Sequence, residues 1–508
     1  MKSSHAILRW GFSSWLAVGI AGILITPVLY LFSNGFGEQG EVTFSTVSWL
    51  LANGNPLYVG PDSAERYSLQ HGPIVYFVVG YIMKAFGPSY LTAKVATVGA
   101  LMLSIAFSWL LFRKRLSRVD SVCLLGLEAW LFMHWPYTYL IRPDALMLLC
   151  VTAGLYFVEA LQKRSQLIIV IALLLGLMIN LKIHGFIYFL PILYLVYRSF
   201  GARTVAVIGG LSILLAVVPF LSPYVSLTNY LFWLSGSINH GIMVGRIVAK
   251  ILLVAAIVIL PVAVGKLCGI NLRSFYLSHR PLLLVVFVAT VLPSIIGSKV
   301  GSGTNHLIPL IPTFMYLYML FIGYVRQKQA SWQPSAVSPG ARYLSVALIT
   351  LIVVIVTIGG INPQKRMVEK IKASGGETII QDLRRLEADY AGCTLAIGYG
   401  EKDSMLYSNI TPLPVFHGSP YLIDMVALGD MAGSGVTIPA ATAQKLNDGA
   451  IRVWLIPRGE KPFAYYLFNG SFRDNFLNHY QMAGKTKYFD VWVYRSMDRA
   501  KLNSNQAF

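Results

Sequence analysis

Hydrophobic residues in this chain gather in long runs that are separated by short polar links. Eleven of these runs approach the roughly 20 apolar residues that a helix needs to cross a lipid bilayer. The pattern therefore predicts a polytopic α-helical membrane protein with about eleven transmembrane helices. Their predicted ranges are 12–33, 91–112, 121–140, 144–161, 166–181, 185–197, 204–221, 247–265, 281–298, 306–325 and 343–361.

A different pattern begins after residue 361. The helical stretch "EKIKASGGETIIQDLRRLEADY" is followed by short runs rich in β-branched and aromatic residues, such as "IRVWLIP" and "YFDVWVYR". We therefore expect a transmembrane domain over residues 1–361 and a small α/β domain over residues 362–508. The longest link of the first domain, residues 34–90, carries two shorter apolar stretches that predict interfacial helices.

Composition and charge place the protein in a membrane and argue against nucleic acid as a partner. Charged residues make up only 12% of the chain, whereas soluble proteins carry about 25%. The net charge of +19 lies mostly in residues 1–361, which hold 24 basic and 8 acidic side chains. No nucleic-acid-binding motif accompanies this charge, and the four scattered cysteines form neither a metal-binding pattern nor a disulfide framework.

The distribution of basic residues predicts an orientation. If the N-terminus is cytoplasmic, the inner links carry 16 basic residues and the outer links and helix mouths carry eight. Positive charge is enriched in cytoplasmic links of membrane proteins. We therefore expect a cytoplasmic N-terminus and an extracytoplasmic C-terminal domain.

Acidic residues are rare in the first 361 positions, and most of them fall on the predicted outer side. Charges near a bilayer are costly, and those that persist usually have a partner or a function. Each predicted outer link also provides at least one cation. The pattern therefore predicts a polar chamber at this face. Its five acids are Glu38, Glu41, Asp62, Glu65 and Asp144.

The outer turns combine groups that suit the transfer of a group from a phosphate ester. A carboxylate can take a proton from a hydroxyl nucleophile, and cations can neutralise a phosphate leaving group. The carboxylates are those of "GEQGE", namely Glu38 and Glu41. The candidate phosphate-binding cations are Arg142, Lys182, Arg246 and Lys299.

Each of these residues also has an ordinary structural explanation. A glutamate that follows a helix end can cap the next helix, and Arg142 with Asp144 can form a local salt bridge. Lysines at helix ends can extend toward the membrane surface, and histidines are more often hydrogen-bonded structural residues than catalysts. Both kinds of explanation stay open at this point.

Four motifs nevertheless resemble a known group of enzymes. The acidic stretch is followed by "LLANGNPLY", by "HGPIVYFVVGYIMKAFGPS", by "RPDAL" and later by "KVGSGTNHLIPLIP". This layout resembles the GT-C superfamily of membrane glycosyltransferases, which use polyprenyl-phosphate sugars and include the protein O-mannosyltransferases and the aminoarabinose transferase of lipid A. The resemblance covers roughly residues 10–325, and the C-terminal domain also fits it.

The resemblance implies an inverting transfer in which an acceptor hydroxyl attacks the anomeric carbon and lipid phosphate leaves. An acidic residue in the first outer loop serves as the base in this family, often within a pair that contains aspartate. Here the stretch reads "EQGE", and counting back from "LLANG" favours Glu41 over Glu38. The residues then expected to contact substrate are Asp62, His71, Asp144, His184, Asn305 and His306.

No spacing of acidic, histidine or cysteine residues in the sequence requires a metal cofactor. Some relatives need a divalent metal, and Glu38, Glu41 and Asp144 could supply oxygen ligands to Mg²⁺ or Mn²⁺. The expected partners are membrane lipids, a polyprenyl-phosphate sugar as donor, and a lipid-linked glycan, lipopolysaccharide or protein as acceptor. The expected location is the bacterial inner membrane, with the C-terminal domain in the periplasm.

Three other functions compete with this one. A flippase or transporter of lipid-linked sugars would place ionisable residues near the bilayer midplane, often in repeated halves, and the sequence has no such repeat. An O-antigen-ligase-type transferase would place its acceptor chemistry in a large late outer loop. A non-catalytic assembly factor would work through its C-terminal domain.

Overall fold

The computed structural model describes residues 2–236, 241–299, 303–328, 339–374, 377–402 and 404–496. The chain folds into two compact units, which we call the bundle unit and the sheet unit. The bundle unit comprises Met1–Leu29, Thr97–Val218 and Gly241–Val368, and the sheet unit comprises Tyr30–Ala96, Pro219–His240 and Glu369–Phe508. The first long link and the C-terminal region therefore belong to the same compact unit. The expected boundary after residue 361 falls inside a continuous helix, α14 (Pro339–Ser374).

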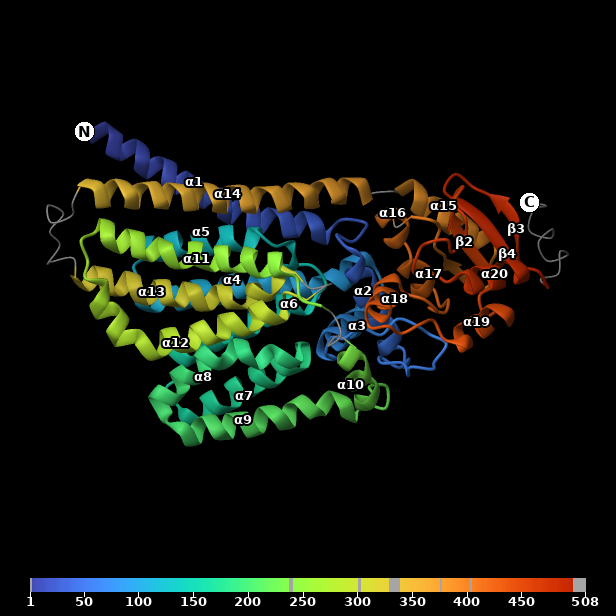
Figure 1. Cartoon of the computed structure of the whole chain (residues 1–508), viewed down its shortest axis with the longest axis horizontal. Helices are drawn as coiled ribbons and strands as arrows, with labels where there is room; N and C mark the ends of the chain where they lie inside the picture. Colours follow the sequence, from blue (N-terminus) through green and yellow to red (C-terminus); the bar gives the residue numbers. More distant parts are fainter. Residues whose placement is uncertain are drawn as a thin grey trace. The chain divides into compact units, whose positions relative to one another are not determined.

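The long apolar runs form long helices, as the hydrophobic pattern predicts (Figure 1). Those that make up the bundle unit in whole or in part are α1 (Lys2–Leu31), α4 (Tyr90–Arg115), α5 (Arg118–Met133), α6 (Pro143–Ala160), α7 (Arg164–Leu181), α8 (Phe186–Phe200), α9 (Ala202–Val217), α11 (Val244–Leu267), α12 (Leu272–Ile296), α13 (Ile311–Lys328) and α14. Short 3-10 segments join them: η1 (Pro136–Thr138), η2 (Ile183–Gly185), η3 (Val218–Leu221) and η5 (Thr304–Leu310).

Ten helices among the described residues are long and apolar enough to cross a membrane, so the chain is an integral membrane protein. They correspond to ten of the eleven predicted ranges. The remaining range, 121–140, forms α5, which has only 16 residues and ends at Met133. A residue that precedes proline disfavours the helical conformation. Trp135, which precedes Pro136, is extended (φ −133°, ψ 110°), and this breaks the run.

Small residues let the bundle helices approach closely, as is common between membrane helices. Gly19 on α1 faces the indole of Trp130 on α5, so that a Cβ there would lie 2.6 Å from the ring. The same indole stacks on Trp15, with ring centroids 5.3 Å apart. On α9, the Ser212 hydroxyl donates to the carbonyl oxygen of Ala172 on α7 at 3.1 Å.

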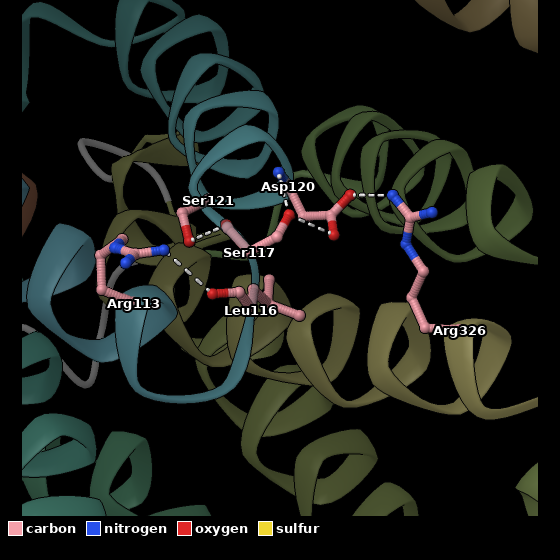
Figure 2. Close-up of polar contacts among 6 residues, drawn as sticks. All are labelled: Arg113, Leu116, Ser117, Asp120, Ser121 and Arg326. Carbon is pink, nitrogen blue, oxygen red and sulfur yellow. Dashed lines mark hydrogen bonds and ion pairs between the residues drawn. The ribbon is translucent and has the colours of Figure 1, made fainter.

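Ion pairs join helix ends on the predicted inner side of the bundle unit. Figure 2 shows Ser117 capping α5 and Asp120 reaching Arg326 of α13, with 2.6 Å between the carboxylate oxygen and the guanidinium nitrogen. Arg115 of α4 donates three hydrogen bonds to Glu159 of α6, which also accepts one from Tyr316 of α13 at 2.6 Å. These contacts tie four helices together at one end.

The sheet unit contains a four-stranded sheet in the order β1-β2-β4-β3. Strand β1 pairs in parallel with β2, and β4 pairs antiparallel with both β2 and β3. The small α/β domain expected from the β-rich runs is therefore present. The strands are β1 (Leu395–Ile397), β2 (Val453–Pro457), β3 (Tyr480–Lys485) and β4 (Phe489–Tyr494). The helices are α2 (Gln39–Ala52), α3 (Ile74–Phe86), α10 (Leu227–Gly236), α15 (Glu377–Asp389), α16 (Met405–Ser408), α17 (Pro412–Phe416), α18 (Met425–Gly433), α19 (Ala440–Asn447) and α20 (Gly470–His479).

The first long link does form two helices, α2 and α3, and they pack against each other within the sheet unit. Their closest approach depends on Gly80, because a Cβ at this position would lie 2.2 Å from the carbonyl oxygen of Ser48. The link is also paired directly with the C-terminal region. Arg66 forms an isolated parallel β-bridge with Ile423, in which the Arg66 amide donates to Leu422 and the Asp424 amide donates to the Arg66 carbonyl.

Candidate active site

The two glutamates of "GEQGE" lie at the N-terminus of α2. Glu38 is the N-cap residue in an extended conformation, and Glu41 lies three residues later in the first turn. Acidic side chains stabilise this end of a helix because its backbone N–H groups carry partial positive charge. Glu41 is fully buried, whereas Glu38 is only partly buried.

Several donors converge on the Glu41 carboxylate. Its Oε2 atom accepts hydrogen bonds from the backbone N–H of Gly37 at 2.6 Å and of Glu38 at 3.2 Å. Its Oε1 atom accepts a hydrogen bond from the hydroxyl of Tyr30. The capping explanation considered from the sequence therefore holds for both glutamates, because they form a reciprocal capping box at the start of α2. Glu41 also fixes the turn before this helix.

A buried lysine lies directly behind this turn. Lys94 of α4 is fully buried, and its ammonium group donates to the carbonyl oxygens of Tyr30 at 2.9 Å and Ser33 at 2.7 Å. The same nitrogen lies 4.5 Å above the centroid of the Tyr30 ring. Lys94 was not selected as a site residue from the sequence. The sequence feature that could have identified Lys94 is its position as a single charge inside an apolar run. Such a charge is costly unless it has a function or partners.

His71 contacts the same helix one turn further along. Its ring stacks on Phe44, with centroids 5.2 Å apart and an interplanar angle of 30°. Its backbone carbonyl accepts a hydrogen bond from the Tyr58 hydroxyl at 2.6 Å. Pro73 directly precedes α3, so His71 is held at the junction between the link and that helix.

Asp62 is exposed on a loop that is organised by Arg66. The Arg66 guanidinium is buried and donates to the carbonyl oxygens of Gly60, Pro61 and Glu65. Burial lowers the pKa of Arg66 to about 10, although the nearby carboxylates of Glu65 and Asp62 oppose this shift. Among the described contacts, none brings Asp62 to the Glu38–Glu41 turn.

A second group of candidate residues lies in the bundle unit around Asp144. This carboxylate is fully buried in the first turn of α6, and it accepts hydrogen bonds from Lys182 at 2.8 Å and from Asn305 at 3.2 Å. The Nε atom of Arg142 lies 3.7 Å from its other oxygen. Lys182 is only 5% exposed, so it is an internal partner of Asp144 and not a lysine that extends to the membrane surface.

Two histidines extend this group. The rings of His184 and His306 stack with centroids 5.3 Å apart, and the Tyr188 hydroxyl donates to the His306 carbonyl at 2.9 Å. The His306 ring also lies against the residue that follows α12, since a Cβ on Gly297 would lie 2.6 Å from it. His306 therefore lies between the Asp144 group and the end of α12.

Three further cations, Arg246, Lys250 and Lys299, lie near the C-terminal end of α12. Arg246 donates to the carbonyl oxygen of Lys299 at 2.8 Å. Lys250, one turn later on α11, is fully buried and donates to Ser298 at 3.1 Å and to the Ser294 carbonyl at 3.2 Å. Lys250 was missed as a site residue, although it too is a charge within an apolar run.

The predicted site residues thus form two sets, one in each unit. Glu38, Glu41, Asp62 and His71 lie in the sheet unit, while the candidate cations, Asp144, Asn305 and both histidines lie in the bundle unit. No three His, Cys, Asp or Glu side chains within the described part of the chain are grouped so that they could hold a metal ion. Two backbone N–H groups and a hydroxyl donate to the Glu41 carboxylate.

The comparisons with known proteins agree with this architecture. Residues 70–226 match the family model described as dolichyl-phosphate-mannose-protein mannosyltransferase. This range includes His71 and the Asp144–Lys182 pair. No curated protein sequence matches the chain at a significant level.

The fold is shared with a solved membrane protein over nearly its whole length. ArnT from Cupriavidus metallidurans bound to undecaprenyl phosphate superposes with a TM-score of 0.55 and 13% sequence identity, covering 96% of this chain and 99% of that one. The apo form of the same protein gives a TM-score of 0.50 and 13% identity, covering 94% and 98% of the two chains. The family match and the shared fold together confirm that this chain resembles the GT-C superfamily of membrane glycosyltransferases.

Proposed function

We propose that this protein is an inverting glycosyltransferase that moves a sugar from a polyprenyl-phosphate donor to an acceptor hydroxyl. The observation that carries the proposal is the fold shared with ArnT over 96% of this chain and 99% of that one. The ArnT structure holds undecaprenyl phosphate, which is a polyprenyl phosphate. The family match over residues 70–226 supports the same class of reaction.

Glu38 is the better candidate for the general base. A base must reach the proton that it removes, and Glu41 is fully buried with its oxygens facing three donors. Glu38 is partly exposed at the first position of the same turn. In this proposal Glu41 is a positioning residue, because it fixes the turn that presents Glu38. The assignment reverses the preference for Glu41 that the sequence alone suggests.

The transfer needs one bond to form and one to break at the anomeric carbon. Glu38 takes the proton of the acceptor hydroxyl as its oxygen attacks that carbon, and the bond to the phosphate oxygen breaks. The polyprenyl phosphate leaves with the electron pair, and the anomeric configuration inverts. Negative charge therefore grows on the phosphate and must be compensated.

Arg142, Arg246 and Lys299 are the proposed phosphate ligands. Each is only partly buried, and a guanidinium group carries five N–H donors in a planar arrangement that suits phosphate. Lys182 is proposed to hold Asp144 in place, since their 2.8 Å ion pair is buried. Asp144, Asn305, His184 and His306 would then line the polar surroundings of the donor, while Asp62 and His71 would face the acceptor.

The remaining parts of the proposal concern substrates and location. A lipid-linked glycan, lipopolysaccharide or protein would accept the sugar, as part of building or modifying the cell envelope. The bacterial inner membrane, with the C-terminal region in the periplasm, would be the site of the reaction. This orientation counts α5 as a crossing in addition to the ten longer helices. The positive charge of the predicted inner links supports it.

A turnover measurement tests the function. Purified full-length protein would be incubated in nanodiscs with a panel of undecaprenyl-phosphate sugars and with cell-envelope glycolipids as acceptors. Mass spectrometry would follow released undecaprenyl phosphate and the glycosylated product. General base catalysis contributes roughly 10²–10⁴-fold, so Glu38→Gln should reduce transfer by about that factor.

Matched variants make the result decisive. Glu65→Gln removes an acid of the same link outside the α2 turn and should keep wild-type transfer. Equal transfer by wild type, Glu38→Gln and Glu41→Gln would rule out a base in this turn. Movement of the donor across the bilayer without any product would instead identify a flippase.

A further inference from the structure

A cavity of about 290 Å³ lies entirely within the sheet unit. Helices α15 and α17 form one side of it, and the first residues of α4 form another. The Glu38–Glu41 turn does not line this cavity, and no residue of the proposed reaction has been placed in it. Its lining therefore calls for a separate explanation.

One face of α15 supplies most of the polar lining. Glu377, Ile380, Arg384 and Glu387 follow each other at steps of three or four residues, which places them in one stripe along a helix. The opposite stripe of α15 is different, because Ile379 and Leu386 are buried in the core of the unit. The three charged side chains therefore line the cavity, on the side of α15 away from Ile379 and Leu386.

Apolar groups complete the cavity. Ile380, Leu383 and Phe416 are buried and contribute to its lining, as does Tyr90. A site with an apolar surface and a polar rim suits a ligand that has one apolar face and several hydroxyl groups. A sugar ring has this character, because its C–H groups form an apolar face and its hydroxyls both donate and accept hydrogen bonds.

The charge of the rim disfavours an anionic ligand. Glu377 and Glu387 oppose the single cation Arg384, and Glu387 also pairs with His417 at 2.9 Å. A phosphate group would lie beside two carboxylates, and the repulsion would disfavour binding. Hydroxyl groups avoid this penalty, since carboxylates accept hydrogen bonds from them and the guanidinium donates to them.

The position of the cavity indicates a ligand attached to a lipid. Tyr90 is the first residue of the α4 candidate span, and the next residue, Leu91, is 41% exposed. The cavity therefore opens where a membrane-spanning segment begins. A sugar bound here could keep its hydrocarbon chain beside α4.

The cavity also adjoins the α2 turn. Phe36 packs edge-on against Tyr90, with ring centroids 5.1 Å apart. The residue after Phe36 is Gly37, whose N–H donates to Glu41 at 2.6 Å. The packed rings of Tyr90 and Phe36 would thus lie between a ligand in the cavity and the turn that carries Glu38.

We propose that this cavity binds a neutral sugar ring of a glycolipid acceptor and holds it near Glu38. The proposal rests on the proposed transferase function and narrows its acceptor to a glycolipid, which excludes the protein acceptor. It assigns Glu377, Arg384 and Glu387 as specificity-determining residues. A protein acceptor would have no need of this cavity.

Photo-crosslinking tests the proposal without requiring turnover. Full-length protein in nanodiscs of phosphatidylglycerol and phosphatidylethanolamine would be exposed to two octyl-chain diazirine probes, one with a neutral hexose headgroup and one with a phosphate headgroup. Mass spectrometry would locate the labelled peptides. The hexose probe should label residues 377–391 or 410–420, and the phosphate probe should label these segments at least several-fold less.

Two neighbouring arginines provide a matched pair of variants. Arg384→Ala removes a cavity donor and should lower hexose labelling and raise the KM for a glycolipid acceptor, each by roughly tenfold, as expected for one charged hydrogen bond. Arg385→Ala changes a side chain that is 78% exposed and pairs with Asp389, and it should leave both quantities unchanged. Donor KM should not change in either variant.

The outcomes separate this proposal from the transferase function. Hexose labelling at the cavity in a protein without transfer activity would support the sugar site and contradict the function. Active transfer with labelling elsewhere, equal labelling by both probes, or equal effects of the two arginine variants would overturn the sugar site and leave the function standing.

Discussion

The hydroxyl of Thr43 donates a 2.8 Å hydrogen bond to the carboxylate of Asp424, 381 residues later in the chain. Both residues are buried. Asp424 also accepts hydrogen bonds from the Tyr421 hydroxyl at 2.5 Å and from the Ala427 backbone N–H at 2.8 Å. Because Thr43 lies two residues after Glu41 on α2, the C-terminal segment holds the helix that carries the proposed base.

Removing this carboxylate should weaken the sheet unit and displace α2. Asp424→Ala leaves the hydroxyls of Thr43 and Tyr421 without their acceptor, and each buried unsatisfied group costs about 1–3 kcal/mol. We expect a lower thermal unfolding midpoint together with reduced kcat for sugar transfer. Thr43→Val removes only the contact between the segments and should cost about 1 kcal/mol. An unchanged kcat in both variants would show that α2 does not depend on this contact.

The same residue should give the stability a pH dependence. Burial raises the pKa of Asp424 above its usual value, although the hydrogen bonds from Tyr421, Ala427 and Thr43 oppose the shift. A raised pKa in the folded state means that the folded protein binds the proton more tightly than the unfolded chain. The contribution of Asp424 to stability is therefore largest below its unfolded pKa of about 3.9 and is lost as pH rises through the folded value.

Wild type and Asp424→Asn should accordingly diverge with pH. Asparagine does not titrate, so the unfolding midpoint of wild type relative to Asp424→Asn should rise as the pH falls from 7 toward 4. Differential scanning fluorimetry of both proteins in the same detergent would measure this difference. Parallel curves over that range would contradict a raised pKa for Asp424.

Lys94 should be essential for the shape of the α2 turn. Lys94→Met keeps the volume but leaves the carbonyl oxygens of Tyr30 and Ser33 without this donor, so we expect a loss of roughly 1–3 kcal/mol per unsatisfied group. Sugar transfer should fall as well, because Tyr30 also donates to Glu41. Lys84→Met, at the end of α3 with one hydrogen bond to Ala52, is a milder control for both stability and transfer. Equal effects of the two variants would contradict a special role for Lys94.

Much of this architecture could be predicted from the sequence, because length and hydropathy determine which segments can span a bilayer. The runs at 91–112 and 204–221 became α4 and α9 with η3, since no proline or charged residue interrupts their central turns. The length of α5 could not be predicted from hydropathy, because Pro136 ends the helix within a run of spanning length.

Some residues of the candidate site could likewise be predicted from the sequence, and others could not. Asp144 and Lys182 could be selected because isolated charges near apolar runs are costly, and they do form a buried pair. The burial of Glu41 and the link between Thr43 and Asp424 could not be selected, because they depend on tertiary packing between distant segments. Asp424 lies in "LIDMV", where an aspartate before a helix looks like an ordinary N-cap, and it does also cap α18.

The buried pair of Asp144 and Lys182 should show strong coupling in a double-mutant cycle. Removing one partner of a buried ion pair leaves an uncompensated charge and typically costs about 3–5 kcal/mol. Asp144→Asn and Lys182→Met should each lower stability by about this amount, while the double variant should cost less than the sum of the two. Arg142→Gln should cost no more than about 1 kcal/mol, because its ion pair is longer, at 3.7 Å, and its side chain is 21% exposed.

Unfolding in mild detergent, measured for the two single variants, the double variant and Arg142→Gln, would provide the cycle. Additive losses would mean that Asp144 and Lys182 do not act as a pair. A large loss in Arg142→Gln would mean that Arg142, and not Lys182, is the main partner of Asp144. Transfer assays on the same variants would then separate the two roles proposed here. Arg142→Gln should raise the donor KM at nearly normal stability, whereas Lys182→Met should lose stability and activity together, because it leaves the buried carboxylate without its closest cation.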